Sequence, residues 1–162
     1  MLLATSRVCA DTIPVCAECD VKTIQQGIDK ARDRDTLLIK EGVYPEFNIL
    51  VNKPLTLLGE NDPVVDGQKK GEIFRIVSDG VRIEGLSIIN VGVSYTSDHS
   101  AIRVVRSKDF YIVKNRFENL FFGIFLEKSS HGVIQENIIM GIARDEYNSG
   151  NGVHLWYSNN IV

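Results

Sequence analysis

The segments Ala101-Ile102-Arg103-Val104, Gly123-Ile124-Phe125-Leu126 and Gly152-Val153-His154-Leu155 are three versions of one phrase. The first two begin 22 residues apart, and the third begins 29 residues after the second, which is the same unit with seven additional residues. Within each copy apolar and polar residues alternate as in a half-buried strand, and the 3.6-residue spacing of a helix is not seen. Short strands that recur at a fixed step of roughly 20 to 29 residues are typical of a β-solenoid.

Polar residues repeat at the same step. A serine follows the start of each copy by six residues, and an asparagine follows the first two serines by eight residues. Asparagine tolerates the left-handed backbone of a turn, and stacked amides can hydrogen-bond from one turn of a solenoid to the next. We therefore expect two stacked columns, one of serines and one of asparagines: Ser107, Ser129 and Ser158, and Asn115 and Asn137.

The alternation also predicts which side chains face the core. The first and third residues after the small leading residue are aliphatic in every copy and should stack inward, about 4.8 Å apart. The second and fourth should point outward. The inward pairs are Ile102/Val104, Ile124/Leu126 and Val153/Leu155, and the outward pairs are Arg103/Val105, Phe125/Glu127 and His154/Trp156.

Earlier segments fit the pattern more loosely. Residues 37–39, 47–51 and 55–58 are predicted strands separated by Gly, Pro and Asn. Residues 81–83 match the strand that follows the repeated serine, with Gly85 near the asparagine position but one residue short of it. The fold class predicted for the chain is an all-β solenoid, a right-handed parallel β-helix of the pectate-lyase type, because parallel crossovers are right-handed.

A helix is predicted before the first strand. Thr23-Ile24-Gln25-Gln26 has the spacing of a capping box and opens a helix through about Arg34, whose apolar stripe would cover the open end of the solenoid. We expect residues 1–22 to form an N-terminal segment with the cysteines, and residues 23–162 to form the capping helix and β-helix. Because the chain stops in mid-rung at Val162, C-terminal rungs are expected to be missing or the end to be covered by a partner.

Composition excludes some function classes. The 162 residues carry a net charge of −3, which favours neither nucleic acid nor an anionic membrane surface. No apolar run approaches the roughly 20 residues of a membrane span. Met1-Leu2-Leu3-Ala4 is at most the remnant of an export signal, which is not complete in this chain.

Three cysteines, Cys9, Cys16 and Cys19, precede the predicted helix. They can form a disulfide that ties down the cap, a soft-metal site, or a redox pair. Redox catalysis is the least favoured, since no βαβ unit surrounds the C-x-x-C pair, and no four-ligand zinc pattern is visible.

The chain resembles a family. Residues 23–31 and 35–46, followed by Lys53-Pro54-Leu55-Thr56-Leu57-Leu58-Gly59, look like the opening of many secreted β-helix proteins. Cys16-Ala17-Glu18-Cys19 before that opening, and Gly150-Asn151-Gly152-Val153-His154-Leu155-Trp156, resemble the NosD family. That resemblance covers nearly the whole chain. It implies a non-enzymatic periplasmic protein that works with an ABC transporter, an ATPase plus a permease, in copper delivery to nitrous-oxide reductase.

Soft ligands make Cys16 and Cys19 the first candidates for Cu(I), provided that the pair is reduced, with His154 as a further candidate. His154 would need Met140 or His99 beside it. The loops 91–99 and 140–149 both precede the strand face that carries His154, so this face is expected either to form an interaction surface or to be covered by those loops. The loop residues concerned are Tyr95, Asp98, His99, Arg144, Asp145, Glu146 and Tyr147.

An enzyme is the competing hypothesis. Ser130-His131-Gly132 resembles a short motif of β-helical galacturonases, and Asp109 should stand one rung below His131. Those enzymes need paired carboxylates across the scissile bond, and no such pair accompanies the motif. A polysaccharide lyase, hydrolase or epimerase is therefore the alternative, together with a carbohydrate-binding solenoid whose platform would be Phe125, His154 and Trp156.

Overall fold

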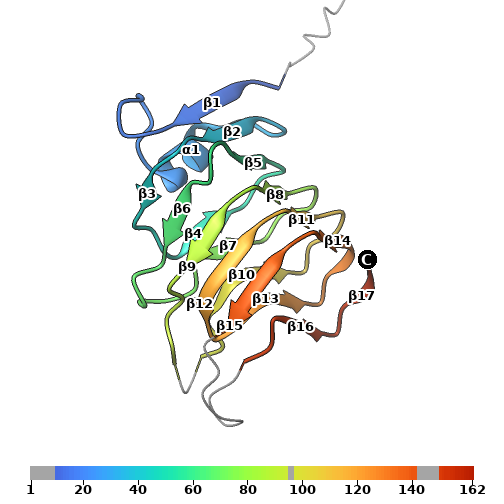
Figure 1. The fold of residues 1–162 in the computed structure, drawn as a ribbon. Coiled ribbons are helices and arrows are strands. Elements are labelled where there is room, and N and C mark those ends of the chain that lie inside the picture. Colours follow the sequence, from blue (N-terminus) through green and yellow to red (C-terminus); the bar gives the residue numbers. More distant parts are fainter. Residues whose placement is uncertain (1–9, 95–96, 142–149) are drawn as a thin grey trace, which may run out of the picture.

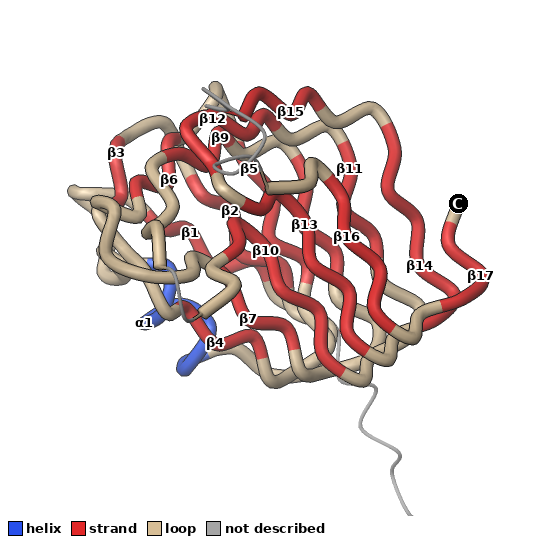
Figure 2. Tube along the Cα trace, turned by 90° about the horizontal axis from the view of Figure 1, so that it is seen from below, coloured by secondary structure: helices blue, strands red, loops and turns tan. Residues whose placement is uncertain are grey.

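The structure is a computed structural model that describes residues 10–94, 97–141 and 150–162. Three parallel β-sheets wind around one apolar core in about five turns, so the predicted parallel β-helix is confirmed (Figures 1 and 2). Sheet A has seven strands, and sheets B and C have five each. Each strand pairs with the equivalent strand of the next turn.

The strand bounds follow the three sheets. Sheet A contains β1 (Thr12–Val15), β2 (Thr36–Ile39), β5 (Thr56–Gly59), β8 (Arg82–Glu84), β11 (Tyr111–Val113), β14 (Ser130–Gln135) and β17 (Asn159–Ile161). Sheet B contains β3 (Val43–Tyr44), β6 (Val64–Asp66), β9 (Ser87–Ile89), β12 (Arg116–Leu120) and β15 (Ile138–Gly141). Sheet C contains β4 (Ile49–Val51), β7 (Phe74–Ile76), β10 (Ser100–Val105), β13 (Phe122–Glu127) and β16 (Val153–Trp156).

The predicted inward stack is confirmed. Ile102 pairs with Ile124, and Ile124 pairs with Val153. Ile102 and Ile124 are fully buried, whereas Val153 is 38% exposed, because no described strand pairs with the outer edge of β16. Burying one such side chain contributes roughly 1.5–3 kcal/mol, so the repeated column is a main source of stability.

The serine column is also confirmed. The Ser129 hydroxyl accepts a hydrogen bond from the Ser107 backbone N–H at 3.3 Å, and the Ser158 hydroxyl accepts one from the Ser129 N–H at 3.1 Å. Ser129 and Ser158 thus each satisfy a backbone donor of the preceding turn.

The asparagine column is confirmed, but the asparagines are not themselves the left-handed residues of their turns. Asn137 Oδ1 accepts from the Asn115 backbone N–H at 3.0 Å, and Asn115 Oδ1 accepts from the Leu86 N–H at 3.0 Å. Leu86, and not Gly85, therefore stands at the asparagine level. Gly85 belongs one residue earlier, where the backbone is left-handed. The left-handed residues of the later turns are accordingly Lys114 and Glu136, each with φ 55°.

The helix is shorter than predicted. α1 (Ile24–Lys30) begins at the predicted N-cap, Thr23, whose side chain accepts from the Gln26 N–H at 3.2 Å. It ends four residues before Arg34, because Ala31 is extended and the Lys53 ammonium binds the carbonyls of Ile28 and Ala31, both at 2.7 Å. The lysine thereby supplies the donors that another helical turn would have given.

Strand β1 precedes the helix in sequence and forms one edge of sheet A. It pairs with β2 over four residues, and α1 contacts β1, β2 and β4 (Figure 1). The first turn is therefore covered by a strand and a helix together. The domain boundary at residue 22 stays a prediction. None of the helices in the described ranges is long and apolar enough to cross a membrane.

Candidate functional site

The outer surface of sheet C carries a column of side chains along the solenoid axis. Residues of successive turns pair in register in the order Leu50, Arg75, Arg103, Phe125 and His154. The outward positions predicted from the alternation are thus confirmed. We call Arg103, Phe125, His154 and Trp156 the sheet C face.

Arg103 is held in a network of charges. The Glu72 carboxylate lies 3.0 Å from Arg103 Nε and 2.5 Å from Arg75 Nε, and Glu127 lies 3.7 Å from Arg103 Nη1. The Arg103 and Glu72 side chains are only 11% and 10% exposed, so solvent screens this pair weakly. Because both carboxylates are paired with arginine, neither is placed as a free acid or base on this face.

Phe125 faces outward yet is buried, with 4% exposure. The Arg103 guanidinium lies 4.1 Å from its ring centroid, the His154 ring stacks on it at 4.7 Å, and Phe122 meets it edge-on at 5.7 Å. A cation over an aromatic face is worth up to about 2 kcal/mol when water is excluded. The Phe125 ring is therefore part of the packing, and the predicted sugar platform is reduced to His154 and Trp156.

His154 and Trp156 form the outer end of the face. The side-chain amide of Asn151 lies 2.9 Å from His154 Nδ1, and this contact orients the imidazole ring. Trp156 is 46% exposed, and the Lys128 ammonium lies 6.0 Å from its ring. This end presents one imidazole beside an exposed aromatic residue.

Met140, a predicted companion of His154, is in β15 of sheet B. His131 of the galacturonase-like motif is in β14 of sheet A, where its Nε2 lies 3.3 Å from the Asn160 amide. Asp109 stands one turn before His131, as predicted, and both have left-handed backbones. Within the described ranges, no group of three or more His, Cys, Asp or Glu side chains is placed to hold a metal ion. Cys9, Tyr95, Arg144, Asp145, Glu146 and Tyr147 lie outside the described residues.

Cys16 and Cys19 are joined by a disulfide, with Cα atoms 5.0 Å apart. Of the three arrangements considered for these cysteines (a disulfide, a soft-metal site and a redox pair), the structure shows the disulfide. They lie at the β1 end of sheet A, whereas His154 lies on β16 at the opposite end of sheet C (Figure 1). The predicted copper ligands therefore do not form one site, and binding through the cysteines would require their reduction to thiols.

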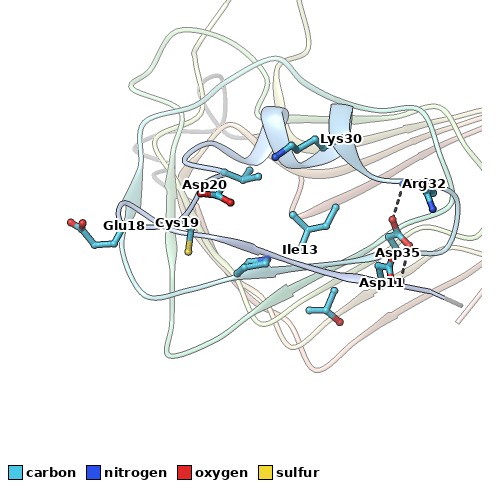
Figure 3. Close-up of a pocket in the computed structure, with 11 residues that line it drawn as sticks. Asp11, Ile13, Glu18, Cys19, Asp20, Lys30, Arg32 and Asp35 are labelled. Atoms are coloured by element: carbon cyan, nitrogen blue, oxygen red, sulfur yellow. Dashed lines mark hydrogen bonds between the residues drawn. The ribbon is translucent and has the colours of Figure 1, made fainter.

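A groove of about 580 Å³ runs between β1 and α1. Figure 3 shows Cys19 and Asp20 at one end of it and Arg32, Asp35 and Asp11 at the other. Carboxylate and cationic side chains both line its walls, with Ile13 between its two ends. The groove is thus polar, of mixed charge, and adjacent to the disulfide.

Asp35 fixes the far end of this groove. Its carboxylate accepts hydrogen bonds from the backbone N–H groups of Asp11 and Arg32, each at 2.8 Å. These bonds, that from Asp11 foremost, hold the pKa of Asp35 below its ordinary value of 3.8. The ionised side chain therefore ties β1 to the turn that follows α1.

We expect Asp35→Asn to be destabilising at neutral pH, and the loss relative to the parent to shrink in acid. The folded pKa is depressed, so the carboxylate stabilises the fold above the unfolded value of about 3.8 and this contribution disappears as the pH falls through the folded pKa. Urea denaturation of both proteins at pH 7 and pH 3 measures the difference. A gap of equal size at the two pH values would contradict this assignment.

Comparison with known proteins gives three findings. Residues 50–162 match the family model described as periplasmic copper-binding protein (NosD). A Pseudomonas aeruginosa protein named as a probable ABC transporter binding protein NosD is 28% identical over 114 residues, covering 67% of this chain and 26% of the relative. The chain thus spans about a quarter of the length of that curated relative. A crystal structure of pectin methylesterase from Aspergillus niger aligns with 93% of this chain and 66% of its own, at 14% identity and a TM-score of 0.49.

Proposed function

Since the chain belongs to the NosD family of periplasmic copper-binding proteins, we propose that it is a non-enzymatic accessory protein that assists copper delivery to nitrous-oxide reductase. The proposal places it in the periplasm beside an ABC transporter. The observation that carries it is the family match over residues 50–162, which includes the whole sheet C face. The name of the Pseudomonas aeruginosa relative supports the association with a transporter.

The chemistry of the sheet C face agrees with a binding role. Glycoside hydrolysis needs two carboxylates free to act on opposite sides of a bond, whereas Glu72 and Glu127 are both engaged by Arg103. The side chains left open at the end of the face are His154, Trp156 and Tyr157, the last two being 46% and 76% exposed. Aromatic residues of this kind are enriched where proteins bind one another, so this end is the proposed contact with a partner.

Copper would be the cargo of such a protein and not a resident cofactor. Thiolates select Cu(I), and reduced Cys16 and Cys19 are close enough to share one ion, since their Cα atoms are 5.0 Å apart in the disulfide. The pair precedes the residues that match the family model, whereas His154 lies within them. We therefore assign Cys16 and Cys19 as the proposed Cu(I) ligands and His154 as a separate, weaker site.

Titration with Cu(I) against a competing chelator tests the copper assignment. The reduced parent should bind one ion tightly, while the oxidised parent and a Cys16→Ser/Cys19→Ser variant should lose at least about tenfold in affinity, equivalent to about 1.4 kcal/mol. His154→Gln serves as the matched control and should retain the tight site. Equal affinity in the reduced parent and the double serine variant would remove the cysteines from the proposal.

The accessory role is tested in a denitrifying host that lacks its own NosD-family protein. The copper content of purified nitrous-oxide reductase is measured with and without this chain, and with a Trp156→Ala/Tyr157→Ala variant. Restored copper content with the parent, reduced by the variant, is the expected result. A chain that neither restores copper nor co-purifies with transporter or reductase would contradict the proposal.

A further inference from the structure

We propose that the Cys16–Cys19 disulfide is a thiol–disulfide exchange site, which a dithiol reductant opens without unfolding the β-helix. The inference deepens the proposed function, because only the reduced pair supplies thiolates for Cu(I). In this proposal the chain is the substrate that another thiol reduces, so it does not itself need the fold of a redox enzyme.

The first argument is that the loop is closed without its sulfur bridge. The Cys16 N–H donates to the Val21 carbonyl at 3.1 Å, and the Cys19 N–H donates to the Cys16 carbonyl at 3.1 Å. Val15 and Val21 form a parallel bridge, and both are buried in the core. A disulfide stabilises mainly by restricting the unfolded chain, and least when the closed loop is short. Opening a bridge between residues three apart therefore leaves the loop held by its own contacts.

The second argument is access. Cys19 lines the groove of about 580 Å³, which is open at the surface beside Asp20 and Glu18 (Figure 3). Both cysteines are partly exposed, in contrast to the fully buried Val15 beside them. A buried structural disulfide would require local unfolding before a thiolate could reach it, whereas this one can be approached in the folded protein.

The exchange proceeds in two balanced steps. A thiolate of the reductant attacks Sγ of Cys19, forming a mixed disulfide while the electrons of the broken S–S bond leave on Sγ of Cys16. The second thiol of the same reductant molecule is then deprotonated and attacks the reductant sulfur that is bonded to Cys19. This step releases Cys19 as a thiolate. The reductant ends as a disulfide, and the Cys16–Cys19 pair gains two electrons, with protons taken up from water.

Charge determines which reductant suits the site. Cys19 stands between Glu18 and Asp20, whereas Cys16 stands between Val15 and Ala17. Attack at Cys19 therefore lets the leaving thiolate form on the sulfur that is not flanked by carboxylates. The same carboxylates repel an incoming anion, so a reductant with positive or neutral surroundings at its reactive thiol should react faster than an acidic one.

The test follows reduction in the folded protein, in a Cys9→Ser background so that only the pair contributes thiols. With excess dithiothreitol and no denaturant, both thiols should become alkylatable at a rate proportional to reductant concentration, and the reduced protein should still melt cooperatively. Reduction that occurs only in denaturant, or at a rate independent of reductant concentration, would overturn the proposal.

Two monothiols of opposite charge locate the attack. Cysteamine should react several-fold faster than glutathione at low ionic strength, and mass spectrometry of the quenched adduct should place the mixed disulfide on Cys19. The ratio of the two rates should fall in high salt and in a Glu18→Gln/Asp20→Asn variant, because both changes remove the electrostatic contribution. An adduct on Cys16, or an unchanged ratio, would overturn attack at Cys19. Rapid exchange without Cu(I) binding would instead refute the copper assignment alone.

Discussion

Replacing Gly132 by alanine is expected to lower the free energy of unfolding by about 3 kcal/mol or more. A Cβ built on Gly132 would lie 2.0 Å from Cζ and 2.3 Å from Cε2 of Phe110. Phe110 is fully buried, so its ring cannot swing into solvent to make room. Urea denaturation of the parent and the variant measures the loss, and a change of less than about 1 kcal/mol would contradict this packing.

A double-mutant cycle isolates the contact between Gly132 and Phe110. Phe110→Ala alone should cost about 3–5 kcal/mol through the cavity it leaves. In that background Gly132→Ala should cost less than about 1 kcal/mol, because the new methyl group occupies space that the ring has vacated. If the two losses simply add, the alanine at position 132 acts through something other than the ring.

Asn115→Ala is expected to cost about 3 kcal/mol. The side chain accepts from the Leu86 N–H at 3.0 Å, and its amide donates to the Ile83 carbonyl at 3.0 Å and to Asn137 Oδ1 at 3.1 Å. Asn115 is 2% exposed, so alanine would leave buried backbone groups of the preceding turn without partners, at about 1–3 kcal/mol each.

Asn119→Ala is the matched control for this prediction. Asn119 belongs to a second polar ladder, in which its amide donates to Asn90 Oδ1 at 3.1 Å and the Asn90 amide donates to Asp66 at 2.9 Å. The Asn119–Asn90 contact is exposed, so water can replace the lost bond and the cost should stay below about 1 kcal/mol. If both substitutions lowered the free energy of unfolding equally in urea denaturation, burial would not determine how much an asparagine of a ladder contributes to stability.

The architecture was predictable because each turn repeats the same contacts. A 22-residue step between two copies is enough to align Ile102 with Ile124 and Ser107 with Ser129, since parallel strands stack residue on residue. The same spacing also identifies the residue that meets Asn115 in the preceding turn. Leu86 follows Ser78 by eight residues, as Asn115 follows Ser107, whereas Gly85 is one residue short of this position.

Contacts between distant segments account for the other differences. The end of α1 depends on Lys53, which is far away in sequence and binds the last carbonyls of the helix. The sequence does not mark Glu72 as a functional residue, although Glu72 lies three residues before Arg75. Its ion pair with Arg103 depends on the pairing of β7 with β10, which the local sequence does not show. His154 and Phe125 were correctly placed outward, but alternation does not predict that one outward ring covers the next.

The corner between sheets B and C has an evolutionary consequence. One residue separates β12 from β13 there, whereas ten separate β9 from β10 and eleven separate β15 from β16. The strands of sheet C keep their register despite this difference, whereas the pairing of β12 with β15 in sheet B shifts register between Glu118 and Leu120. Lineages can therefore lengthen or shorten the chain at this corner without disturbing the stacked columns of sheet C, and recognition beside His154 can diversify while the scaffold stays under constraint.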